Sequence, residues 1–360
     1  MEIADVLSGY KIELSRVESC MESNITSEIK LITEVADHLI AGGGKRIRPL
    51  LHLISSRLCG YRGEASFALA AAIEFIHTAT LLHDDVIDEA VVRRGRPSAN
   101  VVWGNAVSVL VGDFLYSKSF NLLSETDDLR IIRLMAQMAN IMSEGEVFQL
   151  MKCGSADLTE EEYFSIVEKK TAVLISAACE SGAVMGGVDE GRVAALKKYG
   201  YKVGMAFQIV DDALDYMASQ EGFGKSIGKD LEEGKMTLPL IYTLVHSRTA
   251  DREMVRAAIE KKEPTPDVLK AIHSLIRNSG GIDYALERAA GFIREATDEL
   301  SIFHDCREKE ELLAVHNRQE CKPPCKARRR LHRIGQTRHH PKPVFFVFGF
   351  SNDNPIDHGF

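Results

Sequence analysis

Two short acidic motifs, each at the end of a long apolar run, constrain this sequence more than any other feature. The first motif is LLHDDVID at residues 81–88, which follows the stretch FALAAAIEFIHTAT. The second motif, FQIVDDALD at 207–215, repeats the spacing of the aspartates. In a helix of 3.6 residues per turn, the first and last aspartate of each motif share one face, with the middle one beside them. The six residues are Asp84, Asp85, Asp88, Asp211, Asp212 and Asp215.

Carboxylates held this close together favour the binding of a cation. They repel one another, and their pKa values rise unless a cation joins them. A solvated acidic helix turn is the ordinary alternative for one such motif. Both motifs, however, follow apolar runs that must be buried, and duplication makes chance a poor explanation. Two clusters that face each other across a cavity could hold Mg²⁺ with few protein oxygens and leave positions open for a diphosphate.

The apolar pattern predicts an all-α protein. Apolar residues recur at helical spacing in most windows, strand signals are scarce, and a hydrophobic content of 45% is ample for a core. Thr159 and Glu162 form a predicted capping box. The expected helices span 3–22, 27–40, 64–89, 104–123, 128–152, 159–185 and 189–219, followed by several more between 236 and 316. We expect a single large helical bundle with a central cavity lined by the two acidic motifs.

Charge and termini narrow the functional class. No apolar run is expected to reach the length of a membrane span, and the N-terminus lacks the features of a signal peptide. The seven scattered cysteines fit reduced thiols, so we expect a cytoplasmic protein without a transmembrane segment. Residues 317–360 hold nine Lys and Arg against three Asp and Glu, so the strongly acidic charge lies in residues 1–316 and argues against a nucleic-acid partner.

The basic stretch at 317–360 differs in character from the rest. It contains prolines, then a run of aromatic residues, and shows no amphipathic period. Its cysteines and histidines match no zinc-site spacing. We predict a functional domain at 1–316 and an atypical, disordered basic tail at 317–360.

Cations close to the first acidic motif suggest an anion site. Lys45, Arg46 and Arg48 crowd just before Pro49, a residue suited to the first turn of a helix. Backbone N–H groups, the helix dipole and the charges together would bind an anion, although an ordinary basic loop is the alternative. His77 precedes Asp84 by two helical turns on the same face, so we expect it to point into the cavity and contact the substrate, with a buried core histidine as the alternative.

Further cations follow in the chain. Arg93 and Arg94 lie close in sequence to the first motif and suit bidentate bonds to a diphosphate. Lys169, Lys170 and Thr171 interrupt an apolar helical pattern, and Gln208 lies within one turn of the second motif. Lysines within a helix usually face solvent.

A segment rich in Gly and Lys, GFGKSIGKDLEEGKMTLPL, continues from the second motif. It carries Lys225 and Lys235 and resembles a lid that closes on phosphate, with a plain surface loop as the alternative.

Six ordered motifs together resemble the all-trans polyprenyl diphosphate synthase family. They are GGGKRIRP, EFIHTATLLHDDVID, RRGRPSAN, GNAVSVLVGDFLY, FQIVDDALDY and GKSIGKDLEEGKMTLPL, and the resemblance covers roughly residues 3–316. It implies that the diphosphate of isopentenyl diphosphate is held by Lys45, Arg48, His77 and Arg94. It implies that Mg²⁺ is bound by Asp84, Asp88, Asp211 and Asp215. The implied contacts to an allylic diphosphate are Arg93, Lys170, Thr171, Gln208, Lys225 and Lys235.

The resemblance also implies a mechanism and an assembly. An allylic diphosphate, farnesyl or geranylgeranyl, ionises with Mg²⁺ and basic side chains stabilising the leaving group. Isopentenyl diphosphate attacks the carbocation, and loss of a proton completes the cycle. The family further implies a homodimer.

Product length is expected to depend on a tunnel below Asp84. Relatives that make short products often place an aromatic residue five positions before the first Asp, where this chain has Ala79. With Thr80 and Ile76, this residue is a predicted chain-length determinant. The resemblance is strongest to octaprenyl diphosphate synthases in quinone biosynthesis, and heptaprenyl, nonaprenyl and shorter products remain alternatives.

Two other classes compete with a synthase. A class I terpene cyclase also uses an Asp-rich motif on an all-α fold, but it usually carries a different second metal motif and needs no basic isopentenyl site. A non-catalytic subunit of a heteromeric synthase generally has degraded Asp motifs, whereas both motifs are intact here.

Overall fold

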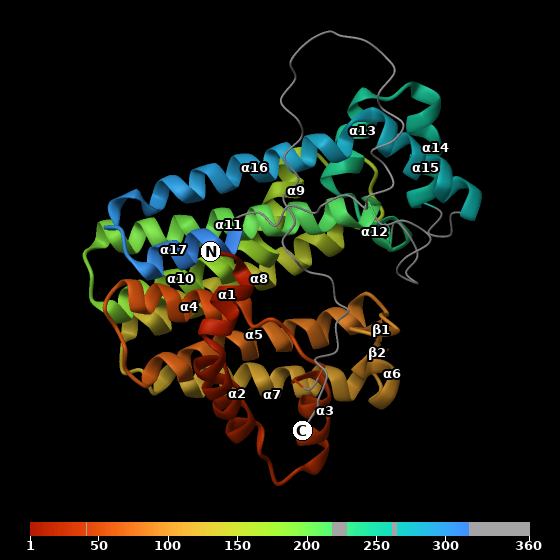
Figure 1. Ribbon diagram of the computed structural model, residues 1–360. Helices are drawn as coiled ribbons and strands as arrows, with labels where there is room; N and C mark the ends of the chain where they lie inside the picture. Colours follow the sequence, from red (N-terminus) through yellow and green to blue (C-terminus); the bar gives the residue numbers. More distant parts are fainter. Residues whose placement is uncertain (41, 218–228, 261–264, 317–360) are drawn as a thin grey trace.

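The computed structural model describes residues 1–40, 42–217, 229–260 and 265–316 (Figure 1). Within them the protein is built of α-helices, with one hairpin of two very short strands, so the predicted fold class is confirmed. Lys225 and the predicted tail at 317–360 lie outside the described residues.

The first half of the chain forms eight α-helices and the hairpin. The helices are α1 (Ile3–Gly9), α2 (Lys11–Ile25), α3 (Lys30–Ile40), α4 (Ile47–Leu58), α5 (Ala65–Ile87), α6 (Ala99–Trp103), α7 (Asn105–Ser124) and α8 (Leu129–Lys152). Strand β1 (Val92–Arg93) pairs antiparallel with β2 (Arg96–Pro97) directly after α5.

The second half contains the remaining helices. They are α9 (Glu160–Val167), the π-helical turn η1 (Glu168–Ala172), α10 (Val173–Gly186), α11 (Glu190–Met217), α12 (Lys229–Glu232), α13 (Leu238–His246), α14 (Thr249–Glu260), α15 (Pro266–Ser279), α16 (Gly281–Glu299), the 3₁₀ turn η2 (Leu300–Ile302) and α17 (Arg307–His316).

The long helices pack in layers. From bottom to top, Figure 1 shows α7, α5, then α8 with α10, then α11 and α16, and these neighbours are in direct contact. Helix α4 packs against both α5 and α10. This arrangement places the end of α5, which carries the first acidic motif, opposite α11, which carries the second.

Helix α5 is the apolar centre of the lower half. By length and composition it could cross a membrane, contrary to the expectation that no segment is long enough. In the protein, however, 67% of its most apolar stretch is buried, because α2, α4 and α7 pack around it. The apolar run therefore forms a core helix, and one face of its C-terminal half, from Glu74 onwards, lines a cavity.

Two helix predictions need correction. The single helix expected at 3–22 is broken at Tyr10 into α1 and α2, because Tyr10 leaves the helical backbone conformation. The helix expected at 159–185 begins with the predicted capping box of Thr159 and Glu162, but η1 interrupts it after α9. The pattern of apolar residues does not reveal the extra residue of a π-turn.

Two glycines allow the helices around η1 to approach closely. A Cβ atom on Gly204 of α11 would lie 2.6 Å from the Cα atom of Ala172, and one on Gly145 of α8 would lie 2.5 Å from Lys169 Cβ. Any larger residue would push these helices apart. The glycines therefore hold η1 between α8 and α11, which brings Lys170 and Thr171 to both.

Buried His52 makes the fold sensitive to acid. Its Nδ1 atom, on α4, lies 3.2 Å from the Ala178 carbonyl oxygen and 2.9 Å from Ser181 Oγ, both on α10. Burial lowers the pKa of His52 from 6.5 to about 4. The unfolded chain therefore takes up a proton first as the pH falls. Neutral His52 therefore makes its full contribution to the free energy of unfolding above about pH 6.5. This contribution, about 3 kcal/mol, is lost as the pH falls towards 4.

We expect His52→Asn to reduce this pH dependence, because the amide can still donate towards α10 and does not titrate. Urea unfolding at pH 7.5 and pH 5 measures the effect. The free energy of unfolding should fall more between these pH values in the wild type than in the variant. Equal falls in both proteins would exclude His52 as the source.

Candidate active site

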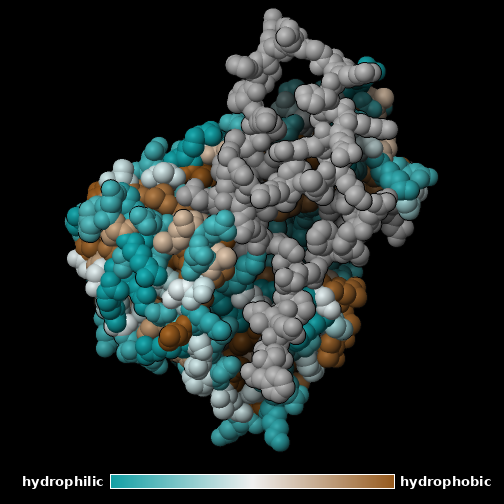
Figure 2. All heavy atoms as spheres, viewed as in Figure 1, coloured by the Kyte–Doolittle hydropathy of each residue, from teal (hydrophilic) through white to brown (hydrophobic). Residues whose placement is uncertain are grey.

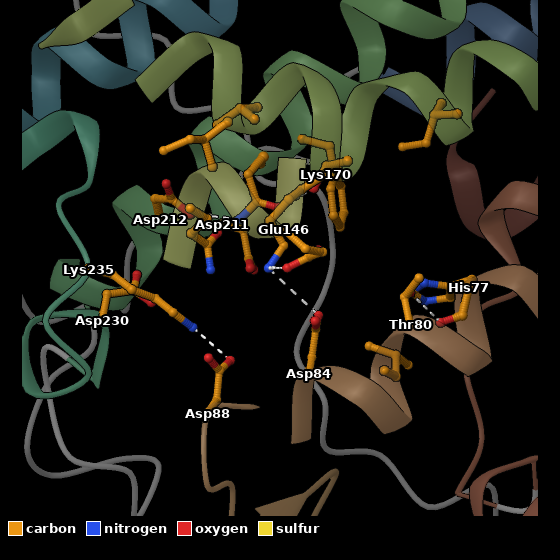
Figure 3. Close-up of a pocket in the computed structure, with 18 of the residues that line it drawn as sticks. His77, Thr80, Asp84, Asp88, Glu146, Lys170, Asp211, Asp212, Asp230 and Lys235 are labelled. Carbon is orange, nitrogen blue, oxygen red and sulfur yellow. Dashed lines mark hydrogen bonds and ion pairs between the residues drawn. The ribbon is translucent and has the colours of Figure 1, made fainter. Parts of the chain in front are cut away.

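A large cavity lies between α5 and the helices α8 to α11. Its volume is about 1080 Å³. The residues that begin α4 line one end, the two acidic motifs line the other, and the segment from Asp230 to Thr237 closes one side. In the close-up of Figure 3, Asp84 and Asp88 extend from the end of α5 towards Asp211 and Asp212 on α11.

A lysine lies near each outer carboxylate of the first motif. Lys170 Nζ lies 3.8 Å from Asp84 Oδ2, and Lys235 Nζ lies 2.9 Å from Asp88 Oδ2 (Figure 3). Burial raises the pKa of Asp84, Lys170 opposes the rise, and Asp88 adds to it. Burial disfavours the charge of Lys235, but Asp88 and Glu233 outweigh it and raise the pKa of the lysine.

The middle aspartate of the first motif points away from the cavity. Asp85 is completely buried, and Arg93 Nε donates to its Oδ1 atom at 2.6 Å. Burial raises the pKa of Asp85, and the Arg93 guanidinium opposes that rise. Arg93 itself lines only a small side pocket and not the main cavity. The structure thus pairs Arg93 with Asp85, where the sequence suggested that Arg93 faces a diphosphate.

The middle aspartate of the second motif is also held by protein donors. Tyr163 OH donates to Asp212 Oδ2 at 2.6 Å, and Gln208 Nε2 donates to Oδ1 at 2.7 Å. Burial raises the pKa of Asp212 to about 7, against the effect of these two donors. Asp211 lines the cavity beside it, whereas Asp215 accepts a hydrogen bond from the backbone N–H of Asp230 at 3.3 Å and does not line the cavity.

Thr171 extends this network into the π-turn. Its hydroxyl donates to Gln208 Oε1 at 2.9 Å, so Gln208 links the π-turn to Asp212. Lys170, Thr171 and Gln208 all line the cavity, as the family resemblance implied, whereas the helical pattern alone favoured a solvent-facing Lys170.

The other end of the cavity is cationic. Lys45, Arg48, His77 and Arg94 line it, and Arg46 binds Glu74 at 3.1 Å below them. The Nε atom of Arg48 is buried and has no hydrogen-bond partner among the described residues. A buried donor without a partner is costly, so this atom suits an anionic ligand.

His77 contributes a neutral group to this cationic end. Burial lowers its pKa well below 6.5, and the charges of Arg48, Arg94 and Arg93 lower it further. His77 therefore offers one N–H donor and one acceptor at neutral pH, whereas the positive charge comes from the arginines and Lys45.

The three predicted chain-length residues differ in position. Thr80 lines the cavity, but Ala79 and Ile76 are completely buried and are not among the lining residues. Ala79 lies one turn before His83, which packs against Gly112 of α7, so it belongs to the face of α5 that contacts α7. A role for Ala79 and Ile76 stays a prediction and requires that the product pass between α5 and α7.

The carboxylates suit a hard divalent cation. Within the described residues, no three His, Cys, Asp or Glu side chains are already close enough to hold a metal ion. The oxygen donors of Asp84, Asp88 and Asp211 nevertheless face one cavity, and burial, which disfavours a lone charge, raises the pKa of Asp84. In proteins generally, Mg²⁺ is held by one or two carboxylates together with substrate phosphates.

Sequence reasoning missed several residues that shape the site. Glu146 Oε2 lies 2.8 Å from Lys170 Nζ, Glu74 binds Arg46, and Tyr163 holds Asp212. Asp230 also lines the cavity, and burial, Asp212 and Asp215 raise its pKa well above its usual value. Of these residues, only Glu74 was unusual in the sequence, because it is an acidic residue within the apolar run of α5.

The family model for polyprenyl synthetase matches residues 29–276. This chain belongs to the polyprenyl synthetase family. The matched range includes both acidic motifs and all of the cavity lining, so the family assignment and the site refer to the same residues. The chain is therefore a prenyltransferase enzyme, and the expectation from the six motifs is confirmed.

Individual relatives and a solved structure support the same family assignment. The chain is 39% identical to the octaprenyl diphosphate synthase of Haemophilus influenzae over 88% of this chain and 95% of the relative. It is 36% identical to the geranyl-diphosphate-specific all-trans-nonaprenyl-diphosphate synthase of Rhodobacter capsulatus, over 86% and 94%. The crystal structure of a Caulobacter crescentus polyprenyl synthase with calcium and isoprenyl diphosphate superposes with a TM-score of 0.83, at 40% identity over 87% and 95%.

Proposed function

We propose that this family member is a long-chain trans-prenyltransferase that condenses isopentenyl diphosphate with an allylic diphosphate in the presence of Mg²⁺. One observation carries the proposal: a single cavity has an acidic end, suited to a metal-bound diphosphate, and a cationic end, suited to a second diphosphate. A terpene cyclase has no use for the second site. The polyprenyl synthase from Caulobacter crescentus, which was crystallised with calcium and isoprenyl diphosphate, supports binding of a divalent cation.

The allylic diphosphate is assigned to the acidic end. Mg²⁺, when bound by Asp84, Asp88 and Asp211, would supply positive charge that stabilises the leaving diphosphate. Asp215 is retained as a proposed fourth ligand, which would first have to release the backbone N–H of Asp230 and turn towards the cavity. Lys170 and Lys235 add ammonium groups on the same side of the cavity. Thr171 and Gln208 provide polar contacts, and Lys225 is retained as a proposed contact outside the described residues. Asp85 and Asp212 contribute to the reaction indirectly. Asp85 accepts a hydrogen bond from Arg93, and Asp212 accepts one from Gln208.

Isopentenyl diphosphate is assigned to the cationic end. Lys45, Arg48 and Arg94 bind its diphosphate, and neutral His77 orients it. Fixing the two substrates in one cavity makes their encounter intramolecular, which is a large part of the rate enhancement. The released diphosphate accepts the proton, so the protein need not supply a base.

The proposed product is octaprenyl diphosphate for quinone side chains, with farnesyl or geranylgeranyl diphosphate as the primer. The octaprenyl synthase of Haemophilus influenzae supports this length. The nonaprenyl synthase from Rhodobacter capsulatus is nearly as similar, so a nonaprenyl product is the second candidate.

We further propose a cytoplasmic homodimer in which residues 1–316 form the catalytic domain. An apolar surface supports the dimer, since large hydrophobic side chains on α6, α7 and α8 are exposed. They are Val101, Val102, Val109, Leu110, Val147, Leu150 and Met151. Figure 2 shows hydrophobic surface at the lower right, where β1, β2 and α6 lie in Figure 1. Burying such a surface against a second copy is favourable.

Incubation of the purified protein with Mg²⁺, farnesyl diphosphate and labelled isopentenyl diphosphate tests the function. Chromatography of the dephosphorylated products should give a dominant C40 band. A C45 band would replace the octaprenyl assignment with nonaprenyl, a C15 or C20 stop would exclude a long-chain synthase, and no incorporation would refute the proposal. Sedimentation of the same sample should show a dimer, and a monomer at assay concentration would refute the proposed homodimer.

A further inference from the structure

Lys170 lies between two carboxylates at unequal distances. Its Nζ atom is 2.8 Å from Glu146 Oε2 and 3.8 Å from Asp84 Oδ2 (Figure 3). The first distance is that of a charge-assisted hydrogen bond, and the second is too long for one. All three side chains are largely buried in the cavity wall, with exposures of 19% for Lys170 and Asp84 and 23% for Glu146. Glu146 thus holds the ammonium more closely than Asp84 does.

The backbone around Lys170 fixes this pairing. The π-turn η1 presents Lys169 and Lys170 in succession towards α8, and Gly145 lets α8 come close to Lys169. Lys169 pairs with Glu144 at 3.7 Å, and Lys170 pairs with Glu146. The first pair lies at the surface, since Glu144 is 58% exposed, and the second lies in the cavity. Two similar pairs therefore differ in whether they face the substrates.

A competition for Asp84 follows from these distances. An ammonium in direct contact with a carboxylate occupies the same oxygen lone pairs that a metal ion needs. If the charge of Glu146 were removed, Asp84 would be the other anionic partner of Lys170 in the structure. The ammonium would then move towards Asp84.

We propose that Glu146 is a positioning residue that holds Lys170 away from Asp84, so that Asp84 stays open to the divalent cation while Lys170 stays within reach of the allylic diphosphate. This inference rests on the proposed metal-binding role of Asp84. Glu146 itself needs no contact with either substrate.

Metal binding without turnover tests the inference. Electron paramagnetic resonance measures Mn²⁺ bound to the protein in the presence of inorganic diphosphate. We expect Glu146→Gln to weaken Mn²⁺ binding by about tenfold, as is typical when a residue that supports a metal ligand is changed. The control Glu144→Gln removes the same charge from the same helix and should leave Mn²⁺ binding unchanged.

A double variant separates positioning from a direct role. In a Lys170→Met background there is no ammonium to move, so Glu146→Gln should no longer weaken Mn²⁺ binding. An equal loss with and without Lys170 would overturn the positioning role, as would an unchanged affinity in the single variant Glu146→Gln. A wild-type protein that binds no Mn²⁺ with diphosphate would instead refute the proposed metal site.

Discussion

We expect Asp84→Asn to lower kcat by about 10² to 10³-fold, the usual effect of losing part of the stabilisation of developing charge, because the proposed Mg²⁺ would lose a ligand. Asp84 faces the cavity, and burial and Asp88 keep its pKa raised in the absence of a closer cation. An amide has nearly the same shape but no negative charge. Steady-state incorporation of labelled isopentenyl diphosphate at saturating substrates and Mg²⁺ measures the loss.

Two further measurements make this result interpretable. Asp305→Asn also removes one carboxylate, but Asp305 is 98% exposed and pairs with Lys309 on α17, so kcat should stay at the wild-type value. Circular dichroism of Asp84→Asn should show a folded protein. A folded Asp84→Asn variant with wild-type kcat would exclude a role for Asp84 in the reaction.

We expect Thr80→Tyr to shorten the product to about the farnesyl or geranylgeranyl length. Thr80 lines the cavity, one helical turn before Asp84 on α5. A phenol ring there fills space that the growing chain would otherwise enter. Product chromatography reads the length directly, and the conservative variant Thr80→Ser, which keeps the hydroxyl that donates to the His77 carbonyl at 2.8 Å, should leave it unchanged.

The parallel variant Ala79→Tyr locates the path of the product. Ala79 is completely buried on the face of α5 that contacts α7, and a ring forced into a packed core costs about 1 to 3 kcal/mol. Shortening by Thr80→Tyr alone would place the path along the lining of the described cavity. Shortening by Ala79→Tyr alone would place it between α5 and α7 and exclude Thr80 as the wall.

Long amphipathic helices were predictable from the sequence because their apolar period is set by burial. The expected helices at 64–89 and 128–152 agree closely with α5 and α8. The break at Tyr10 and the turn η1 were not predictable, since a local change in helix geometry leaves the apolar pattern almost unaltered. The hairpin of β1 and β2 is too short to show any alternation.

The candidate site likewise has features that were predictable from the sequence and features that were not. Spacing alone suggested that Asp84 and Asp88 share a face, and the structure places both at the cavity. Spacing did not reveal that Asp85 turns away to bind Arg93, because the side-chain direction depends on the hairpin that brings Arg93 back. Glu146 had no signal at all, since a glutamate in an amphipathic helix usually faces solvent.

The π-turn at Glu168–Ala172 makes this stretch intolerant of changes in length. Loss of a single residue there would restore an ordinary α-helix and rotate everything before it by about 100° relative to α10. The contacts of Lys170 with Glu146 and of Thr171 with Gln208 would then change, although no functional side chain had been substituted. Sequences that retain this chemistry should therefore vary here by substitution, and a one-residue gap would mark a protein that has lost the site.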